Sequence, residues 1–254
     1  MELEIQTSGK FKYIESGEGE PIILLHGLFG ALSNFQDLFN FFKTKYKVII
    51  PMLPLYDMGL ETGVNTLTKY VTQFIEHRGY KKVHILGNSL GGHVSLLYTL
   101  KNQDKLQTLI LTGSSGLYEN GMGDSYPKRG DYEYIKKKTE DTFYDPAMAT
   151  PELVDEVYGI VTNRLKAIKV IALAKSAIRN NLSDELRTIE IPTCLIWGKQ
   201  DGVTPPEVAE DFHKLIPNSE LHWIDKCGHA AMMERPEAFN EILGAFLAKH
   251  PIAQ

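Results

Sequence analysis

Short apolar runs alternate with amphipathic stretches along most of the chain, and this alternation limits the possible folds more than any other feature. Eight segments have the length and apolar content of strands: residues 3–6, 11–15, 21–25, 46–53, 82–87, 106–112, 193–197 and 220–224. Between them, apolar residues recur at helical spacing, as at Leu67, Val71 and Phe74. Strands that alternate with helices of this length predict a mostly parallel sheet covered by helices on both faces.

The helices expected from this pattern lie at residues 35–42, 67–75, 90–101, 207–215 and 236–249. Ser33 is the predicted N-cap of the first helix, because a serine side chain can accept a hydrogen bond from a free N–H of the first turn. Continuous apolar runs such as Pro21–Leu25 favour strands that are buried on both faces of the sheet.

The alternation stops between residues 116 and 182. This section has no convincing strand, and its helical patterns lie at residues 150–160 and 165–178. We therefore predict one core made of residues 1–115 and 183–254, with residues 116–182 as a helical lid. Such a lid would lie over the carboxyl edge of the sheet, where open α/β sheets bind ligands. A structural helical subdomain with no contact to substrate is the alternative.

Composition excludes several classes of protein. Among 254 residues, 43% are hydrophobic and 23% are charged, which is typical of a globular domain and not of a disordered one. The net charge of −5 and the absence of a long basic run argue against a nucleic-acid partner. Two cysteines cannot form a disulfide framework. No apolar run approaches the roughly 20 residues of a membrane span.

Metal and nucleotide motifs are also absent from the sequence, so we expect neither a cofactor nor a metal. The first residues lack the basic and apolar regions of a secretory signal, and a cytoplasmic location is expected.

A Gly-x-Ser-x-Gly motif at residues 87–91 lies between a predicted strand and a predicted helix. A serine at such a tight turn has a strained backbone, and only glycine-sized neighbours let the chain pass so closely. Its hydroxyl then projects above the sheet beside a helix N-terminus, which favours developing negative charge. The strand before Ser89, the glycines around it and the helix after it all match this turn, so Ser89 is the predicted nucleophile.

Two further residues can activate this serine. His229 follows the last predicted strand, and its loop returns to the same edge of the sheet. Asp201 follows the strand at residues 193–197 and can orient the imidazole ring. Asp225 is the alternative acid, although it is too close in sequence to His229 to orient the ring easily. The order Ser89, Asp201, His229 is that of one particular fold.

Stabilisation of a transition-state oxyanion needs N–H donors. The amide of Leu90 follows the nucleophile directly, and the amide of Leu28 in the His-Gly-Leu-Phe-Gly run offers a second donor. Phe29 would form part of the pocket wall. His26 is expected to hold this loop in shape by hydrogen bonding.

The combination of His26-Gly27-x-x-Gly30, Gly87-x-Ser89-x-Gly91, Asp201 and Gly228-His229 resembles the α/β-hydrolase superfamily, and the resemblance covers essentially the whole chain. It implies an α/β-hydrolase fold, with a mostly parallel eight-stranded sheet, flanking helices and a helical lid insertion.

Within the superfamily, Asn88, Arg164 and the Cys227-Gly228-His229 run resemble the carbon–carbon bond hydrolases of meta-cleavage products. The resemblance implies that Arg164 binds a substrate carboxylate and that Asn88 lines the pocket. Two features depart from the pattern. Ala230 stands where that family usually has tryptophan, and residues 52–57 replace the common Asp-x-x-Gly-x-Gly stretch.

Three other residues near these motifs have simpler interpretations. His93 lies one helical turn after Ser89 and is read as a satisfied, buried histidine. Cys227 is read as packing, because nothing basic flanks it in a geometry that would lower its pKa. Met233, like its neighbour Met232, could line a pocket or fill a gap in the core.

These observations predict a serine hydrolase that acts at a carbonyl through an acyl-enzyme, as a carboxylesterase on small to medium apolar esters. The partner is a small molecule, and an apolar lid is also compatible with a homodimer. One alternative is hydrolysis of a dienoate diketone of the meta-cleavage type. Others are perhydrolysis, as in cofactor-free haloperoxidases, and a triad-containing sensor of a small ligand.

Overall fold

A computed structural model describes residues 4–30, 32–59, 62–120, 128 and 130–252. Its centre is an eight-stranded sheet in the order β1-β2-β4-β3-β5-β6-β7-β8. The strands are β1 (Gln6–Ser8), β2 (Phe11–Ser16), β3 (Pro21–Leu25), β4 (Lys47–Pro51), β5 (Val83–Asn88), β6 (Leu106–Thr112), β7 (Thr193–Gly198) and β8 (Ser219–Ile224). Pairing is antiparallel from β1 to β2 and from β2 to β4, and parallel across the rest of the sheet.

All eight predicted strands are confirmed. The first is the least accurate, because β1 overlaps the predicted segment only at Gln6 and residue 3 lies outside the described residues. The continuous apolar runs form central strands that are buried on both faces, as predicted: four of the five residues of β3 are buried, and so is every residue of β5.

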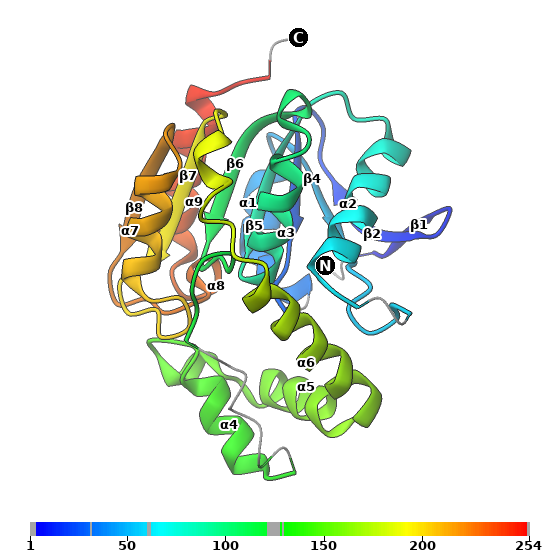
Figure 1. Ribbon diagram of the computed structural model, residues 1–254, viewed down its shortest axis with the longest axis vertical. Coiled ribbons are helices and arrows are strands. Elements are labelled where there is room, and N and C mark those ends of the chain that lie inside the picture. Colours follow the sequence, from blue (N-terminus) through cyan, green and yellow to red (C-terminus); the bar gives the residue numbers. More distant parts are fainter. Residues whose placement is uncertain (1–3, 31, 60–61, 121–127, 129, 253–254) are drawn as a thin grey trace.

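Helices cover both faces of this sheet (Figure 1). The core helices are α1 (Gln36–Phe42), α2 (Val64–Arg78), α3 (Leu90–Thr99), α7 (Pro206–Leu215), α8 (Ala231–Glu234) and α9 (Pro236–Lys249). The two faces of the sheet have separate hydrophobic cores, and successive residues of β3 point to opposite faces. Ile23 and Leu25 pack on the side of α2, α3 and α7, whereas Ile22 and Leu24 pack on the side of α1 and α9. The sheet is therefore the middle layer of three.

The predicted cap of the first helix is wrong. Ser33 lies inside a short 3-10 helix, η1 (Leu32–Phe35), and α1 begins after Phe35 with no side-chain cap. The 3-10 turn itself leads the chain into α1, so no side chain is placed to accept from its first turn.

Among the described residues between β6 and β7, three segments are α-helices: α4 (Tyr132–Glu140), α5 (Pro151–Thr162) and α6 (Arg164–Arg179). They gather at one end of the molecule in Figure 1, and we call residues 132–179 the α4–α6 insertion. The sequence patterns anticipated α5 and α6 but missed α4. Only Ile135 and Thr139 of α4 are buried, so its apolar periodicity is too sparse to detect.

Candidate active site

Ser89 occupies the sharp turn between β5 and α3. Its φ of 55° and ψ of −120° lie in a region that L-residues seldom adopt, and such a conformation costs about 1–3 kcal/mol. The neighbouring glycines make the turn sterically feasible. A Cβ at Gly87 would collide with the carbonyl oxygen of Gly91, and a Cβ at Gly91 would collide with the carbonyl oxygen of Leu25. The hydroxyl-bearing residue is therefore held at the carboxyl edge of the sheet.

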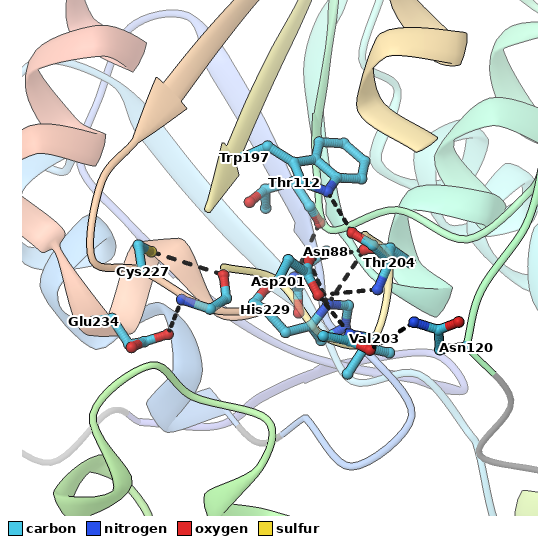
Figure 2. A network of polar contacts seen from close by, with 12 residues as sticks. Asn88, Thr112, Asn120, Trp197, Asp201, Val203, Thr204, Cys227, His229 and Glu234 are labelled. Carbon is cyan, nitrogen blue, oxygen red and sulfur yellow. Dashed lines mark hydrogen bonds and ion pairs between the residues drawn. The ribbon is translucent and has the colours of Figure 1, made fainter. Parts of the chain in front are cut away.

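His229 and Asp201 are hydrogen-bonded in the loops that follow β8 and β7. Nδ1–H of His229 donates to Oδ2 of Asp201 at 2.9 Å and is 3.2 Å from Oδ1 (Figure 2). Both side chains are buried. The carboxylate also accepts from the backbone N–H groups of Val203 (2.8 Å) and Thr204 (2.9 Å) and from the Thr204 hydroxyl (2.8 Å). These donors fix the carboxylate, which in turn fixes the ring.

The charge around His229 favours its protonated form. Burial lowers the pKa of His229. The negative charge and hydrogen bond of Asp201, with smaller contributions from Glu119 and Glu234, raise it by more than burial lowers it, so the pKa is above its ordinary value. Asp225 plays no part in this arrangement. It is exposed, and one of its oxygens accepts from Gln200 at 3.4 Å.

The loops that carry these residues are packed against the ends of β5 and β6. A Cβ at Gly113, whose φ is +51°, would lie 2.8 Å from Nδ1 of His229. The amide of Asn88 donates to the carbonyl oxygen of Thr112 at 3.0 Å and to that of His229 at 3.4 Å. Asn88 lines the cavity, as the resemblance implied, and also holds the two strand ends and the histidine loop together.

The loop after β3 lies directly over Ser89. A Cβ at Gly27 would be 3.1 Å from the Cβ of Ser89, so glycine lets the loop approach. Nδ1–H of the buried His26 donates to the carbonyl oxygen of Gly27 at 2.9 Å, and the N–H of Gly30 donates to the same oxygen at 3.0 Å. The loop thus has the internal hydrogen bonds expected of it, and burial lowers the pKa of His26, which favours the neutral ring.

A cavity of about 360 Å³ opens on these residues. From the core it is lined, among others, by Leu28, Phe29, Asn88, Ser89, Leu90, Ser115, His229, Ala230 and Met233. From the α4–α6 insertion it is lined by Lys138, Thr139, Leu153, Val157, Ala174, Ala177 and Ile178. The segment between α4 and the next turn adds Asp141, Thr142 and Phe143. The candidate nucleophile, base and oxyanion donors therefore share one largely apolar cavity.

Sequence reasoning missed two acidic residues of this cavity, Glu119 and Asp141. Glu119 lies a few residues after β6, and burial raises the pKa of its carboxyl group. Its position after a strand end was the available signal, but the residue fell inside the section read as a lid. Lys138 and Asp141 are the other charged side chains that the described cavity wall contains, besides His229.

Arg164 is not brought to the site. It is exposed at the first position of α6 and is not among the described residues that line the cavity. The reason is its place along the helix: the residues of α6 that line the cavity, Ala174, Ala177 and Ile178, lie ten or more positions further along, about 15 Å or more from Arg164 along the helix axis.

The remaining candidates differ in their surroundings. His93 is buried as predicted, and its Nε2 is 2.9 Å from Oδ1 of Asn180, but its buried Nδ1 has no hydrogen-bond partner among the described residues, so the ring is only partly satisfied. Burial raises the pKa of the Cys227 thiol to about 12, which keeps it protonated. Met232 fills space in the core, whereas Met233 lines the cavity, so each of the two predicted roles applies to one of the methionines.

Comparisons with known proteins agree with this geometry. Residues 22–242 match the alpha/beta hydrolase family. The crystal structure of MGS-MChE2, an alpha/beta hydrolase enzyme from the metagenome of sediments of the lagoon of Mar Chica, Morocco, is 47% identical in sequence, with a TM-score of 0.81 over 97% of this chain and 98% of that one.

Two curated relatives have different activities in their names. The 2-hydroxy-6-oxo-6-(2'-aminophenyl)hexa-2,4-dienoic acid hydrolase of Metapseudomonas resinovorans is 30% identical, over 94% of this chain and 87% of the relative. Lipase 1 of Psychrobacter immobilis is 26% identical, over 91% of this chain and 78% of the relative. Given the match over most of its length, the chain belongs to the alpha/beta hydrolase family and is a hydrolase.

Proposed function

We propose that this hydrolase is a carboxylesterase that acts on small to medium apolar esters through Ser89, His229 and Asp201. The observation that carries the proposal is the apolar cavity into which Ser89 and the Asp201-bound His229 both face. A cavity of about 360 Å³ accommodates a small organic molecule, and its walls favour an apolar acyl or alcohol part.

In the proposed mechanism, each of these groups has one role. Nε2 of His229 takes the proton of the Ser89 hydroxyl, and the serine oxygen attacks the ester carbonyl. The backbone N–H groups of Leu28 and Leu90 stabilise the oxyanion. His229 then protonates the leaving alcohol and activates a water molecule that hydrolyses the acyl-enzyme. Asp201 keeps the ring in the required tautomer and stabilises the imidazolium.

The helical section of the chain, residues 116–182, is proposed as the lid of this site. It supplies apolar wall residues such as Leu153, Val157 and Ile178, and these side chains would determine the length of the acyl chain. The boundaries follow the predicted ones, with residues 1–115 and 183–254 as the catalytic core.

A second function uses the same residues on a different bond. The relative from Metapseudomonas resinovorans is named as a hydrolase of a dienoic acid, and such a substrate carries a carboxylate. Among the described residues that line the cavity, Lys138 is the side chain with a permanent positive charge. Carbon–carbon bond hydrolysis would therefore require Lys138, and not the exposed Arg164, to bind the carboxylate.

The test compares initial rates on p-nitrophenyl esters with acyl chains of two to twelve carbons. Ser89→Ala is expected to lose activity at least about a thousandfold. Ser115→Ala is the matched control, because Ser115 lines the same cavity and donates its backbone N–H to the carbonyl oxygen of Ser89 (3.2 Å), a bond that alanine retains. Equal near-background rates in the wild type and in Ser89→Ala would refute the ester proposal.

The same proteins are then assayed on a 2-hydroxy-6-oxo-dienoate. Turnover that disappears in Ser89→Ala and falls in Lys138→Ala, but not in Arg164→Ala, would support the second function. Absence of turnover by the wild type would remove it.

A further inference from the structure

A second buried carboxylate, Glu234, lies behind the candidate base. One carboxylate oxygen, Oε1, accepts the N–H of Gly228 at 2.7 Å, and Gly228 directly precedes His229 (Figure 2). The other oxygen, Oε2, accepts the N–H groups of Tyr144 at 2.8 Å and of Asp145 at 3.3 Å. Glu234 is only 6% exposed. One side chain thus holds the histidine loop and a segment beyond α4.

The two backbones that Glu234 joins are also in direct contact. The N–H of His229 donates to the carbonyl oxygen of Thr142 at 3.0 Å. A Cβ at Gly228 would lie 2.7 Å from the same oxygen and 2.8 Å from the nitrogen of Tyr144. The position of His229 is therefore set on one side by Asp201 and on the other by residues 142–145.

Residues 142–145 reach the substrate cavity as well. Thr142 and Phe143 line it, whereas Tyr144 and Asp145 supply the N–H groups bound by Glu234. A shift of this segment would move a cavity wall and the backbone contact of His229 together.

We propose that Glu234 is a positioning residue, which fixes His229 relative to Ser89 by holding residues 142–145 against the histidine loop. The proposal rests on the proposed function, in which His229 is the base. All three groups bound by Glu234 are donors, so an ionised carboxylate satisfies them, whereas the NH₂ of a glutamine would face one of them without an acceptor. A misplacement of about 1 Å in such a site can lower a rate about a hundredfold.

The test uses Glu234→Gln, Glu234→Asp and the control Glu237→Gln, whose side chain is exposed in the first turn of α9. Active sites are first counted by covalent labelling with a fluorophosphonate, and kcat and KM are then measured per labelled site on the best p-nitrophenyl ester. Glu234→Gln is expected to lower kcat and the labelling rate tenfold to a hundredfold, while Glu237→Gln retains both.

The pH profile separates positioning from simple loss of stability. His229 faces three acidic side chains: Asp201 after β7, Glu119 after β6 and Glu234 in α8. Arg235 adds a positive charge next to Glu234. Removal of one negative charge in Glu234→Gln should move the acid limb of kcat/KM to lower pH. Glu234→Asp keeps the charge but is one methylene shorter, so its rate should fall with the limb in place. This variant also carries the test if Glu234→Gln does not fold.

The proposal would be overturned by a rate per labelled site equal to that of the wild type in both Glu234 variants, including the case in which only the melting temperature falls. Failure of the proposed function is a separate result, because the wild type would then neither hydrolyse esters nor react with the fluorophosphonate.

Discussion

The carboxyl edge of the sheet and the α4–α6 insertion contribute to the same cavity in different ways. At the sheet edge, Asp201 accepts four hydrogen bonds and Asn88 bridges two loops. The helices of the insertion have a small core of their own, in which Ile135 and Val157 are among the three buried members. The comparison indicates that the chemical groups are held by many directional bonds, whereas the insertion supplies apolar surface.

Hydrogen bonds also join the insertion to the core, but they lie near the start of α2 and not among the proposed catalytic groups. Besides the Glu234 contacts, α6 is joined to the core near the start of α2, where the N–H of Val64 donates to the Ser176 hydroxyl at 3.1 Å. Nζ of Lys169 donates to the carbonyl oxygen of Gly59 at 2.5 Å and to the Thr62 hydroxyl at 2.9 Å. Substitutions at the sheet edge should therefore affect rate, and substitutions in the insertion should affect selectivity.

Asp201→Asn should have the largest effect of the variants that follow. An asparagine amide cannot accept the present set of N–H donors with both of its heteroatoms, and the ring of His229 would lose the tautomer that frees Nε2. A loss of about 10³- to 10⁴-fold in kcat is expected. Asp225→Asn, at the exposed alternative acid, should leave kcat unchanged. Retention of a tenth of the activity by Asp201→Asn would contradict the assignment.

Ala174→Phe tests the other side of the comparison. Ala174 lines the cavity on α6, so a phenyl ring there would fill space meant for a long acyl chain. Esters of eight to twelve carbons should lose roughly tenfold or more in kcat/KM, the loss expected from a steric conflict of about 1–3 kcal/mol, while acetate esters keep most of their rate. Ala172→Phe on the same helix, outside the described cavity wall, is the control. An equal loss for all chain lengths would contradict a role in selectivity.

Glu119→Gln should change the pH dependence more than the maximal rate. The carboxylate stabilises protonated His229, and its removal should lower the pKa of His229. Because the neutral ring is the form that acts as base in the proposed mechanism, the acid limb of kcat/KM should then move to lower pH. Glu210→Gln, exposed on α7, should leave the profile in place. A limb that moves to higher pH would show that the sign of this interaction is wrong.

The smallest effect is expected for Arg164→Ala. The side chain is exposed and does not line the described cavity, so kcat/KM should change less than twofold on esters and on dienoates alike. A selective loss on dienoates would instead mean that α6 moves to bring Arg164 to the substrate.

The parts of the molecule that could be predicted from sequence are those encoded locally. The strand positions and the sharp turn at Ser89 depend on short-range patterns of apolar residues and glycines. The one-turn helix α8 and the largely polar helix α4 contain too few apolar residues at helical spacing to be predicted.

The groups that sequence reasoning missed act across long separations. Glu234 binds a segment 90 residues earlier in the chain, so the residues next to it in the sequence do not indicate this contact. The hydroxyl of Thr204 donates to Asp201 because of the conformation of the loop after β7, which the sequence pattern does not show. The opposite error, at Arg164, has the same origin: the sequence shows an arginine in a helix, but the packing of α6 decides which of its turns borders the cavity.

The backbone of Ser89 has a consequence for selection. Glycine adopts its positive φ without the steric penalty of a side chain, so Ser89→Gly would relieve strain at the residue that we propose as the nucleophile. Stability and activity are thus opposed at this residue. A population of variants screened for folding alone would accumulate glycine there and become inactive, whereas serine persists only where hydrolysis itself is selected.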